Sequence, residues 1–208
     1  MTRVPYLIHS IAAIVLCISA IPAAHANLIT NGGFETQNPT PSSPPPGWTA
    51  IGTGIAVDTF FPSTGIYDTA FTALSTDPNP GVLSQTVSTT PGVAYTLSFS
   101  LLDQALFPGA DAFVVSFGGF TNTVLGANLT PATYTFETLK MPGSSVAGSS
   151  TILSFKGLVD PISGGIFNLD NVSLTATAIP EPSAATLFAV AVGLLGLLTT
   201  QRKISTKR

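Results

Sequence analysis

The residues of this chain that could do chemistry are carboxylates. Between residues 27 and 179 there are nine of them and two cations, Lys140 and Lys156, so this segment carries a net charge of −7. The nine acids are Glu35, Asp58, Asp68, Asp77, Asp103, Asp111, Glu137, Asp160 and Asp170. A glycosidase needs only two carboxylates, but no spacing in the sequence pairs any two of these. A small secreted glycosidase is therefore the least favoured function.

Other kinds of active site can be excluded from the residue types. His9, His25 and Cys17, the only histidines and cysteine of the chain, all lie within the first 26 residues. The segment after them cannot form a Ser-His-Asp or Cys-His site, and it lacks the nitrogen and sulfur ligands that zinc prefers. Its acidic charge also argues against nucleic acid, which binds basic surfaces. We expect no enzyme, no required cofactor and no nucleic-acid partner.

The elements that carry these acids are expected to be strands. Residues 93–101 alternate strictly between apolar and polar side chains, which is the period of a half-buried strand. Shorter alternations follow at 113–117, 134–136 and 153–155, separated by Pro-Gly and Gly-Gly steps. The pattern predicts an all-β, antiparallel sandwich of about nine strands. Near Asp170 and Asn171 the apolar phase shifts, which indicates either a β-bulge or the end of a strand.

The N-terminus has the parts of a secretory signal peptide. Arg3 precedes a short apolar stretch, and Ala24-His25-Ala26 is a small-x-small cleavage site. We expect a signal peptide over residues 1–26, with signal peptidase cutting after Ala26 to leave Asn27 as the new N-terminus. The alternative is an N-terminal membrane anchor, for which the apolar stretch is short.

The last 29 residues combine three features in a fixed order. Pro180-Glu181-Pro182 precedes an uncharged run at 183–200, and a basic tail follows: Arg202, Lys203, Lys207 and Arg208. Eighteen apolar residues just suffice for a transmembrane helix, and the cations favour a cytoplasmic C-terminus. The physics alone would fit a plain membrane anchor. The prolines, however, favour an exposed, extended conformation that a protease could bind.

This arrangement resembles the PEP-CTERM sorting signal of bacterial exported proteins. The resemblance implies recognition by an exosortase, a membrane cysteine protease-transpeptidase. It further implies a membrane-anchored precursor and a processed form at the cell surface or in extracellular polysaccharide.

A second resemblance covers most of residues 27–177. The stretches 27–35 and 47–48 look like the opening of galactose-binding-like jelly rolls, which include carbohydrate-binding modules, and 167–174 looks like their last strand. The resemblance implies a jelly-roll sandwich whose first and last strands lie side by side. It also implies a structural calcium held by Glu35 and Asp170, with backbone carbonyls near Asn31. Two surface carboxylates without a metal are the alternative.

A sugar site would expose a flat aromatic ring. Tyr95 and Tyr134 alternate with apolar residues and are expected to be buried, which leaves Trp48 and Tyr67 as the rings able to stack on a sugar. Core packing is the competing role for Trp48. Two hypotheses follow for residues 27–179: a non-catalytic surface or matrix protein associated with exopolysaccharide, or a carbohydrate-binding module displayed at the envelope.

Overall fold

The computed structural model describes residues 26–36, 44–107 and 109–177. The predicted sorting signal at 180–208, with its apolar run at 183–200, lies outside the described residues, as does the signal peptide up to residue 25. The processing sites and the basic tail therefore stay predictions. Among the described residues, no helix has the length and apolar character needed to cross a membrane.

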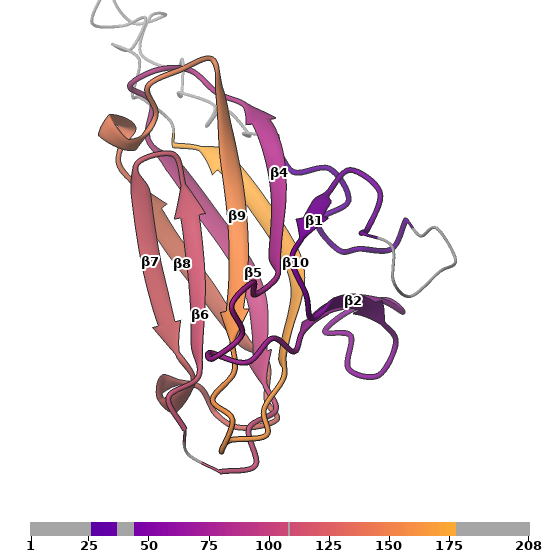
Figure 1. Cartoon of the computed structure of the whole chain (residues 1–208). Helices are drawn as coiled ribbons and strands as arrows, with labels where there is room; N and C mark the ends of the chain where they lie inside the picture. The colour runs from indigo at the N-terminus through magenta and orange to yellow at the C-terminus, as the bar shows by residue number, and fades with distance from the viewer. Residues whose placement is uncertain (1–25, 37–43, 108, 178–208) are drawn as a thin grey trace, which may run out of the picture. The chain divides into compact units, whose positions relative to one another are not determined.

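Two antiparallel sheets of five strands each pack face to face (Figure 1). The first sheet has the order β1-β4-β9-β6-β7. Its strands are β1 (Thr49–Ile51), β4 (Val82–Ser88), β9 (Ser150–Leu158), β6 (Ala112–Phe117) and β7 (Phe120–Leu125).

The second sheet has the order β2-β3-β10-β5-β8. Its strands are β2 (Ile55–Asp58), β3 (Asp68–Phe71), β10 (Phe167–Ala176), β5 (Tyr95–Asp103) and β8 (Thr135–Met141). Two short 3-10 helices, η2 (Gly126–Asn128) and η3 (Gly143–Ser145), follow β7 and β8. Successive strands mostly cross between the sheets, which confirms the expected sandwich; the described residues form ten strands where about nine were predicted.

The core lies between the sheets and is rich in phenylalanine. Phe113 of the first sheet contacts Phe71 and Phe167 of the second, with ring centroids 5.2 and 5.4 Å apart. On β5, Tyr95, Leu97, Phe99 and Leu101 are all buried, so the predicted alternation is confirmed; Val93 is half-buried just before the strand. Edge-to-face and tilted ring pairs of this kind add to the stability that burial of apolar surface provides.

The predicted irregularity in the last strand is present. The pairing of β10 with β5 shifts register between Asp170 and Ser173, and Asn171 has a φ of 53°. Asparagine tolerates this left-handed conformation better than most residues. Because of the shift, Leu169 and Val172 both face the core although they lie in opposite phases of the sequence.

One predicted orientation is wrong. Tyr134 and Phe136 were expected to turn inward, but Phe136 is 66% exposed on edge strand β8. The two phases of β8 are both partly apolar, and the phase that contains Leu139 and Met141 packs on the core instead. Tyr134 and Phe136 consequently lie on the outward face of the second sheet.

Candidate functional site

The chain's N-terminal segment pairs with its last strand. Leu28 donates its amide to the carbonyl of Leu174, and Val172 donates to Gly32, both at 2.8 Å. The side-chain oxygen of Asn27 also accepts the amide of Leu174 at 2.9 Å. Residues 27–32 thus lie beside the last strand as the resemblance implied, but they form no strand of their own. The pairing fixes Glu35 close to β10.

Glu35 and Asp170, the two acids predicted to hold calcium, bind the same loop. This loop, residues 59–67, connects β2 to β3. Oε1 of Glu35 accepts the amides of Ile66 and Tyr67 at 2.9 and 3.0 Å, while Oδ2 of Asp170 accepts the amide of Thr64 at 2.9 Å. The structure therefore brings the two carboxylates to opposite ends of one short stretch of backbone.

Gly65 lies where this loop passes Glu35. Its φ is +70°, and a β-carbon there would come within 2.2 Å of the Glu35 carboxylate. A residue with a side chain would be strained in this conformation and would displace the carboxylate. The close approach of loop and acid thus depends on a glycine.

The environment of Asp170 opposes its negative charge. The side chain is fully buried, and burial raises the pKa of Asp170, to which the charge of Glu35 adds; the backbone amides of Thr64, Asn171 and Ser63 act in the opposite direction. Oxygen-only donors with uncompensated charge suit a hard cation such as calcium. Among the described residues, however, no three His, Cys, Asp or Glu side chains gather closely enough to form a metal site, so backbone oxygens would have to complete the shell.

The structure decides between the two roles considered for Trp48. Its side chain is only 6% exposed, its ring packs against Phe34 and Phe155, and its indole N–H donates to the carbonyl of Asn31 at 3.1 Å. The indole is a core residue, and neither of its faces is free for a sugar. Tyr67 is half-buried and packs against the core as well, with its amide held by Glu35.

Two further carboxylates face each other on β2 and β3. Asp58 stands opposite Asp68 in the register of these strands, and both point away from the core. Asp68 is fully buried, and burial, together with a hydrogen bond to Asp58 and its charge, raises the pKa of Asp68 to about 8. Oδ1 of Asp68 has no hydrogen-bond donor. A proton shared by the two carboxyls would supply one, as in other carboxyl pairs.

Hydrogen bonds from β10 and from the residue just before β8 hold Asp68 in place. Its Oδ2 accepts Nδ2 of Asn168 at 2.9 Å and lies 3.0 Å from the hydroxyl of Tyr134. The same hydroxyl contacts the carbonyl of Phe61, which can only accept. The single proton of the Tyr134 hydroxyl therefore lies between two acceptors, the carbonyl of Phe61 and Oδ2 of Asp68. Burial, and then the charge of Asp68, raise the pKa of Tyr134.

Exposed phenylalanine rings lie around this acid pair and on the same sheet. Phe60, whose amide donates to Oδ1 of Asp58 at 2.9 Å, is 79% exposed, and Phe61 is 50% exposed. Phe136 projects from β8, opposite Ser100 of β5. A row of hydroxyl side chains, Ser173, Ser98 and Thr138, crosses the adjoining strands β10, β5 and β8 beside it. We call this outward side of β10, β5 and β8 the hydroxyl face.

A second carboxyl pair lies at one end of the sandwich. Asp103 and Asp111 are both buried, and burial, followed by the charge of Asp111, raises the pKa of Asp103. Asp111 accepts the hydroxyl of Ser163 at 2.7 Å, and Asp103 accepts the amide of Ala105 at 3.0 Å. These bonds tie together the loops after β5 and β9, so the pair has a structural role.

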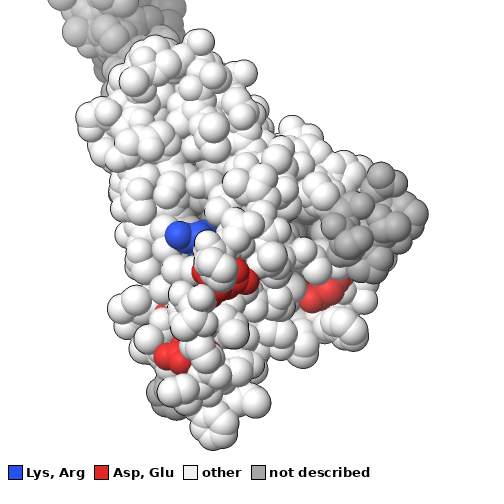
Figure 2. All heavy atoms as spheres, viewed as in Figure 1, with Lys and Arg blue, Asp and Glu red and all other residues white. Residues whose placement is uncertain are grey.

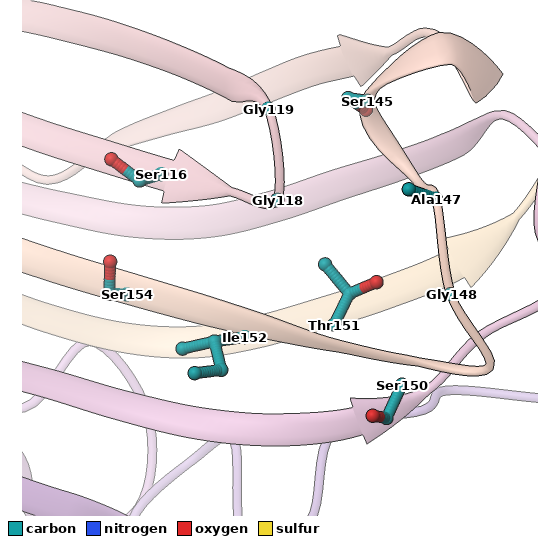
Figure 3. Close-up of a pocket in the computed structure, with 10 residues that line it drawn as sticks. All are labelled: Ser116, Gly118, Gly119, Ser145, Ala147, Gly148, Ser150, Thr151, Ile152 and Ser154. Carbon is teal, nitrogen blue, oxygen red and sulfur yellow. The ribbon is translucent and has the colours of Figure 1, made fainter.

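An open hollow of about 540 Å³ lies on the other sheet, next to the β6–β7 turn (Figure 3). Figure 3 shows the loop of Ser145, Ala147 and Gly148 beside that turn. All but Ile152 of the residues that line the hollow are small: Ser116, Gly118, Gly119, Ser145, Ala147, Gly148, Ser150, Thr151, Ile152 and Ser154. The lining has no aromatic ring and no charge. Figure 2, which views the molecule from the side of this sheet, shows one blue patch and a few red patches on a largely uncharged surface.

The sequence identified some of these residues and missed others. The resemblance placed Glu35 and Asp170 together correctly, but no spacing in the sequence paired Asp58 with Asp68. The signal that could have revealed the pairing of Asp58 with Asp68 is weak. The two acids are ten residues apart, with a Phe-Phe-Pro step between two short stretches of β-like sequence. Phe136 was assigned to the core.

No protein-family model matches the sequence, and no curated protein matches it either. Solved structures do share its fold. TmCBM61 in complex with beta-1,4-galactotriose gives a TM-score of 0.53 at 18% identity, covering 73% of this chain and 99% of the other. Family 16 Carbohydrate Binding Module-2 gives 0.52 at 19% identity, covering 72% and 99%.

An enzyme is among the similar structures too. The Stig cyclase Fisc from Fischerella sp. TAU gives a TM-score of 0.52 at 19% identity, covering 73% of this chain and 96% of the other. Together these likenesses show that the chain has the jelly-roll fold of carbohydrate-binding modules. Because the fold occurs in a binding module and in an enzyme, function has to be argued from the side chains.

Proposed function

We propose that residues 27–179 form a non-catalytic carbohydrate-binding domain that binds an extracellular polysaccharide through the hydroxyl face and Phe136. The observation that carries the proposal is the exposed ring of Phe136 beside the cross-strand row of Ser173, Ser98 and Thr138. A flat apolar ring can stack on the C–H face of a sugar, while neighbouring hydroxyls exchange hydrogen bonds with its hydroxyl groups. The carbohydrate-binding modules of similar fold support this choice.

The geometry of the acids favours binding over hydrolysis. The carboxyls of a glycosidase lie across a space that holds the scissile bond, about 5 to 9.5 Å apart. Asp58 and Asp68 instead stand opposite each other on adjacent strands, and Asp68 is enclosed by Asn168 and Tyr134. Because Asp68 is fully buried, its carboxyl is not open to a sugar.

Export and sorting complete the proposal. The signal peptide at 1–26 and the Pro180-Glu181-Pro182 signal with its basic tail support secretion by signal peptidase and processing by an exosortase. The domain would then be displayed at the surface of a bacterium or retained in its polysaccharide matrix. An acidic domain without cysteine is compatible with that location.

Calcium has a structural role in the proposal. Glu35 and Asp170 would provide oxygen ligands, and the ion would neutralise two carboxylates that both hold the 59–67 loop. Binding would fix the position of this loop against β10. No catalytic role is assigned to the ion.

Binding of the purified full chain to a panel of neutral and charged polysaccharides, by affinity electrophoresis, tests the proposal. We expect retardation by at least one polysaccharide, and a loss of about tenfold in affinity for Phe136→Ala, which corresponds to roughly 1.4 kcal/mol. Ile152→Ala is the matched control, because Ile152 is 58% exposed on the outward face of the other sheet. Equal loss in both variants, or no retardation at all, would contradict the proposal.

A further inference from the structure

The hydroxyl face continues beyond the row of hydroxyls next to Phe136. A further cross-strand row follows it, in which Thr175 stands opposite Thr96 and Thr96 stands opposite Lys140. Every second residue of β8 is exposed, and Lys140 is in the same phase as Phe136. The ammonium group of Lys140 therefore shares one face of the sheet with the ring that the proposed function uses.

Lys140 is not neutralised by the domain. Its side chain is exposed and makes no ion pair or hydrogen bond with any residue that the structure describes. Glu137, the other charged residue of β8, lies in the opposite phase and stands opposite Phe99. Asp103 and its neighbour Asp111 lie at the far end of β5. Although residues 27–179 carry a net charge of −7, the row at Lys140 is therefore positive.

The spacing of the two side chains limits how a ligand can use them. Lys140 lies four residues beyond Phe136 on β8, which is about 13 Å along a strand that rises roughly 3.4 Å per residue. A single sugar ring cannot contact both. The hydroxyls of Ser98, Thr138 and Thr96 lie in the rows between and beside them. A chain that stacks one sugar on Phe136 therefore places a later sugar at Lys140.

We propose that Lys140 binds the carboxylate of a uronic acid and so determines the substrate class of the hydroxyl face, which is an acidic polysaccharide. This inference rests on the proposed carbohydrate-binding function. Lys140 and Thr96 are direct cross-strand neighbours, with their Cβ atoms about 5 Å apart. One carboxylate can therefore accept from the ammonium with one oxygen and from the threonine hydroxyl with the other. A neutral sugar at this position leaves the ammonium with water alone.

Anionic lipid is the competing partner for Lys140. The hydroxyl of Thr177, the last residue that the structure describes, lies 3.3 Å from that of Thr96, so Lys140 is at the end of the domain where the chain leaves it. Recognition of anionic lipid, however, depends on clusters of about four to eight cations. Among the described residues from 27 to 177 the only other cation is Lys156, on the other sheet. The polysaccharide, which also uses Phe136, is therefore the favoured partner.

Isothermal titration of the full chain with hexagalacturonate and with its methyl ester tests the inference, because the two ligands differ in charge and share their sugar. Hexamannuronate and its methyl ester form a second pair of ligands. In at least one pair we expect the acid to bind about threefold to fivefold more tightly than the ester, as for an exposed ion pair. The preference should shrink as the ionic strength rises from about 0.01 M to about 0.5 M, because salt screens exposed charges.

Three variants assign the preference to Lys140. Lys140→Gln should bind the acid and the ester equally well, with its affinity for the ester unchanged, and Lys140→Arg should keep the preference. Lys156→Gln is the matched control, because it removes the same charge from the outward face of the other sheet, where Lys156 stands opposite Val114. It should keep the preference of the wild type. Circular dichroism of each variant checks that it is folded.

The outcomes distinguish this inference from the function on which it rests. Acid hexamers that bind no better than their esters, or a preference that survives in Lys140→Gln, would overturn the role of Lys140 and leave carbohydrate binding intact. Binding to phosphatidylglycerol vesicles that is lost in Lys140→Gln, without a preference for acid hexamers, would assign the lysine to a membrane instead. Binding to no polysaccharide of the panel would overturn both proposals.

Discussion

Asp68 shows how a single residue can set the pH dependence of this domain. Its pKa is raised to about 8, first by burial and then by Asp58. An acid with a raised pKa binds its proton more tightly in the folded state than in the unfolded chain, whose carboxyls titrate near 4. The unfolded state therefore holds fewer protons between about pH 4 and pH 8, and the free energy of unfolding falls as the pH rises through this window.

We predict that Asp68→Asn removes this contribution. The amide can donate to Asp58 and still accept from Asn168, so it reproduces the neutral acid without an ionisable proton. The variant should be more stable than wild type at about pH 8, by several degrees in melting temperature, with the gap narrowing towards pH 4. Melting curves at four pH values measure this difference, and a gap that does not change with pH would contradict the shared-proton account.

Calcium gives the second prediction at the scale of residues. An ion that binds only the folded state, at a hundred times its Kd, adds about 2.7 kcal/mol, which is a shift of several degrees for a domain of this size. We expect the full chain to melt higher in millimolar calcium than in chelator, and Asp170→Ala to lose the shift. Identical melting curves for wild type in the two buffers would contradict the predicted calcium site. A shift that survives in Asp170→Ala would place the ion elsewhere.

Strand β5 allows the sandwich to be tested at the scale of elements. Phe99 is fully buried against Phe113 and Phe155, whereas Ser98 points outward on the hydroxyl face. Phe99→Ala should reduce the free energy of unfolding by ~3–5 kcal/mol, as the loss of a buried ring does. Ser98→Ala should cost well below about 1 kcal/mol. Denaturant titrations of the two variants provide the measurement, and similar losses in both would contradict the assignment of faces.

The elements also show what the sequence could reveal. The period of two in residues 93–101 predicted a strand, and the phase shift at Asp170 indicated either a bulge or a strand end, because each pattern depends only on neighbours along the chain. The pairing of Asp58 with Asp68 depends on the register of β2 and β3. The nine-residue connection between them does not fix that register, so the acid pair could not be predicted.

The predicted orientation of edge strand β8 was wrong for a related reason. Tyr134 and Phe136 in one phase compete with Leu139 and Met141 in the other, and only the partner sheet decides which phase is buried. Trp48 illustrates the same limit, since an indole suits a core and a sugar site equally well by type. The proximity of Glu35 and Asp170 could be predicted only because the resemblance to jelly-roll modules covers both the first and the last part of the domain.

At the scale of the whole molecule, the two predicted terminal signals would determine which part of the chain is finally displayed. Ala24-His25-Ala26 predicts a cut that leaves Asn27 first, and the side chain of Asn27 helps to hold the fold together, because it accepts the amides of Ile29 and Leu174 at 3.0 and 2.9 Å. A cut after Ala26 would preserve this contact. A cut after Asn27 would remove one of the groups that join the N-terminal segment to β10.

We therefore predict that the precursor is processed twice. Mass spectrometry of the protein recovered from the cell surface should find Asn27 at the N-terminus and no peptide beyond Gly193. Replacing Pro180 and Pro182 with alanine should retain the basic tail in the recovered chain, because a continuous helix would remove the extended stretch on which cleavage depends. Wild-type chains that start at Asn27 but end at Arg208 would show that residues 183–200 serve as a plain anchor. The domain would then act at the membrane surface, and not in a released matrix.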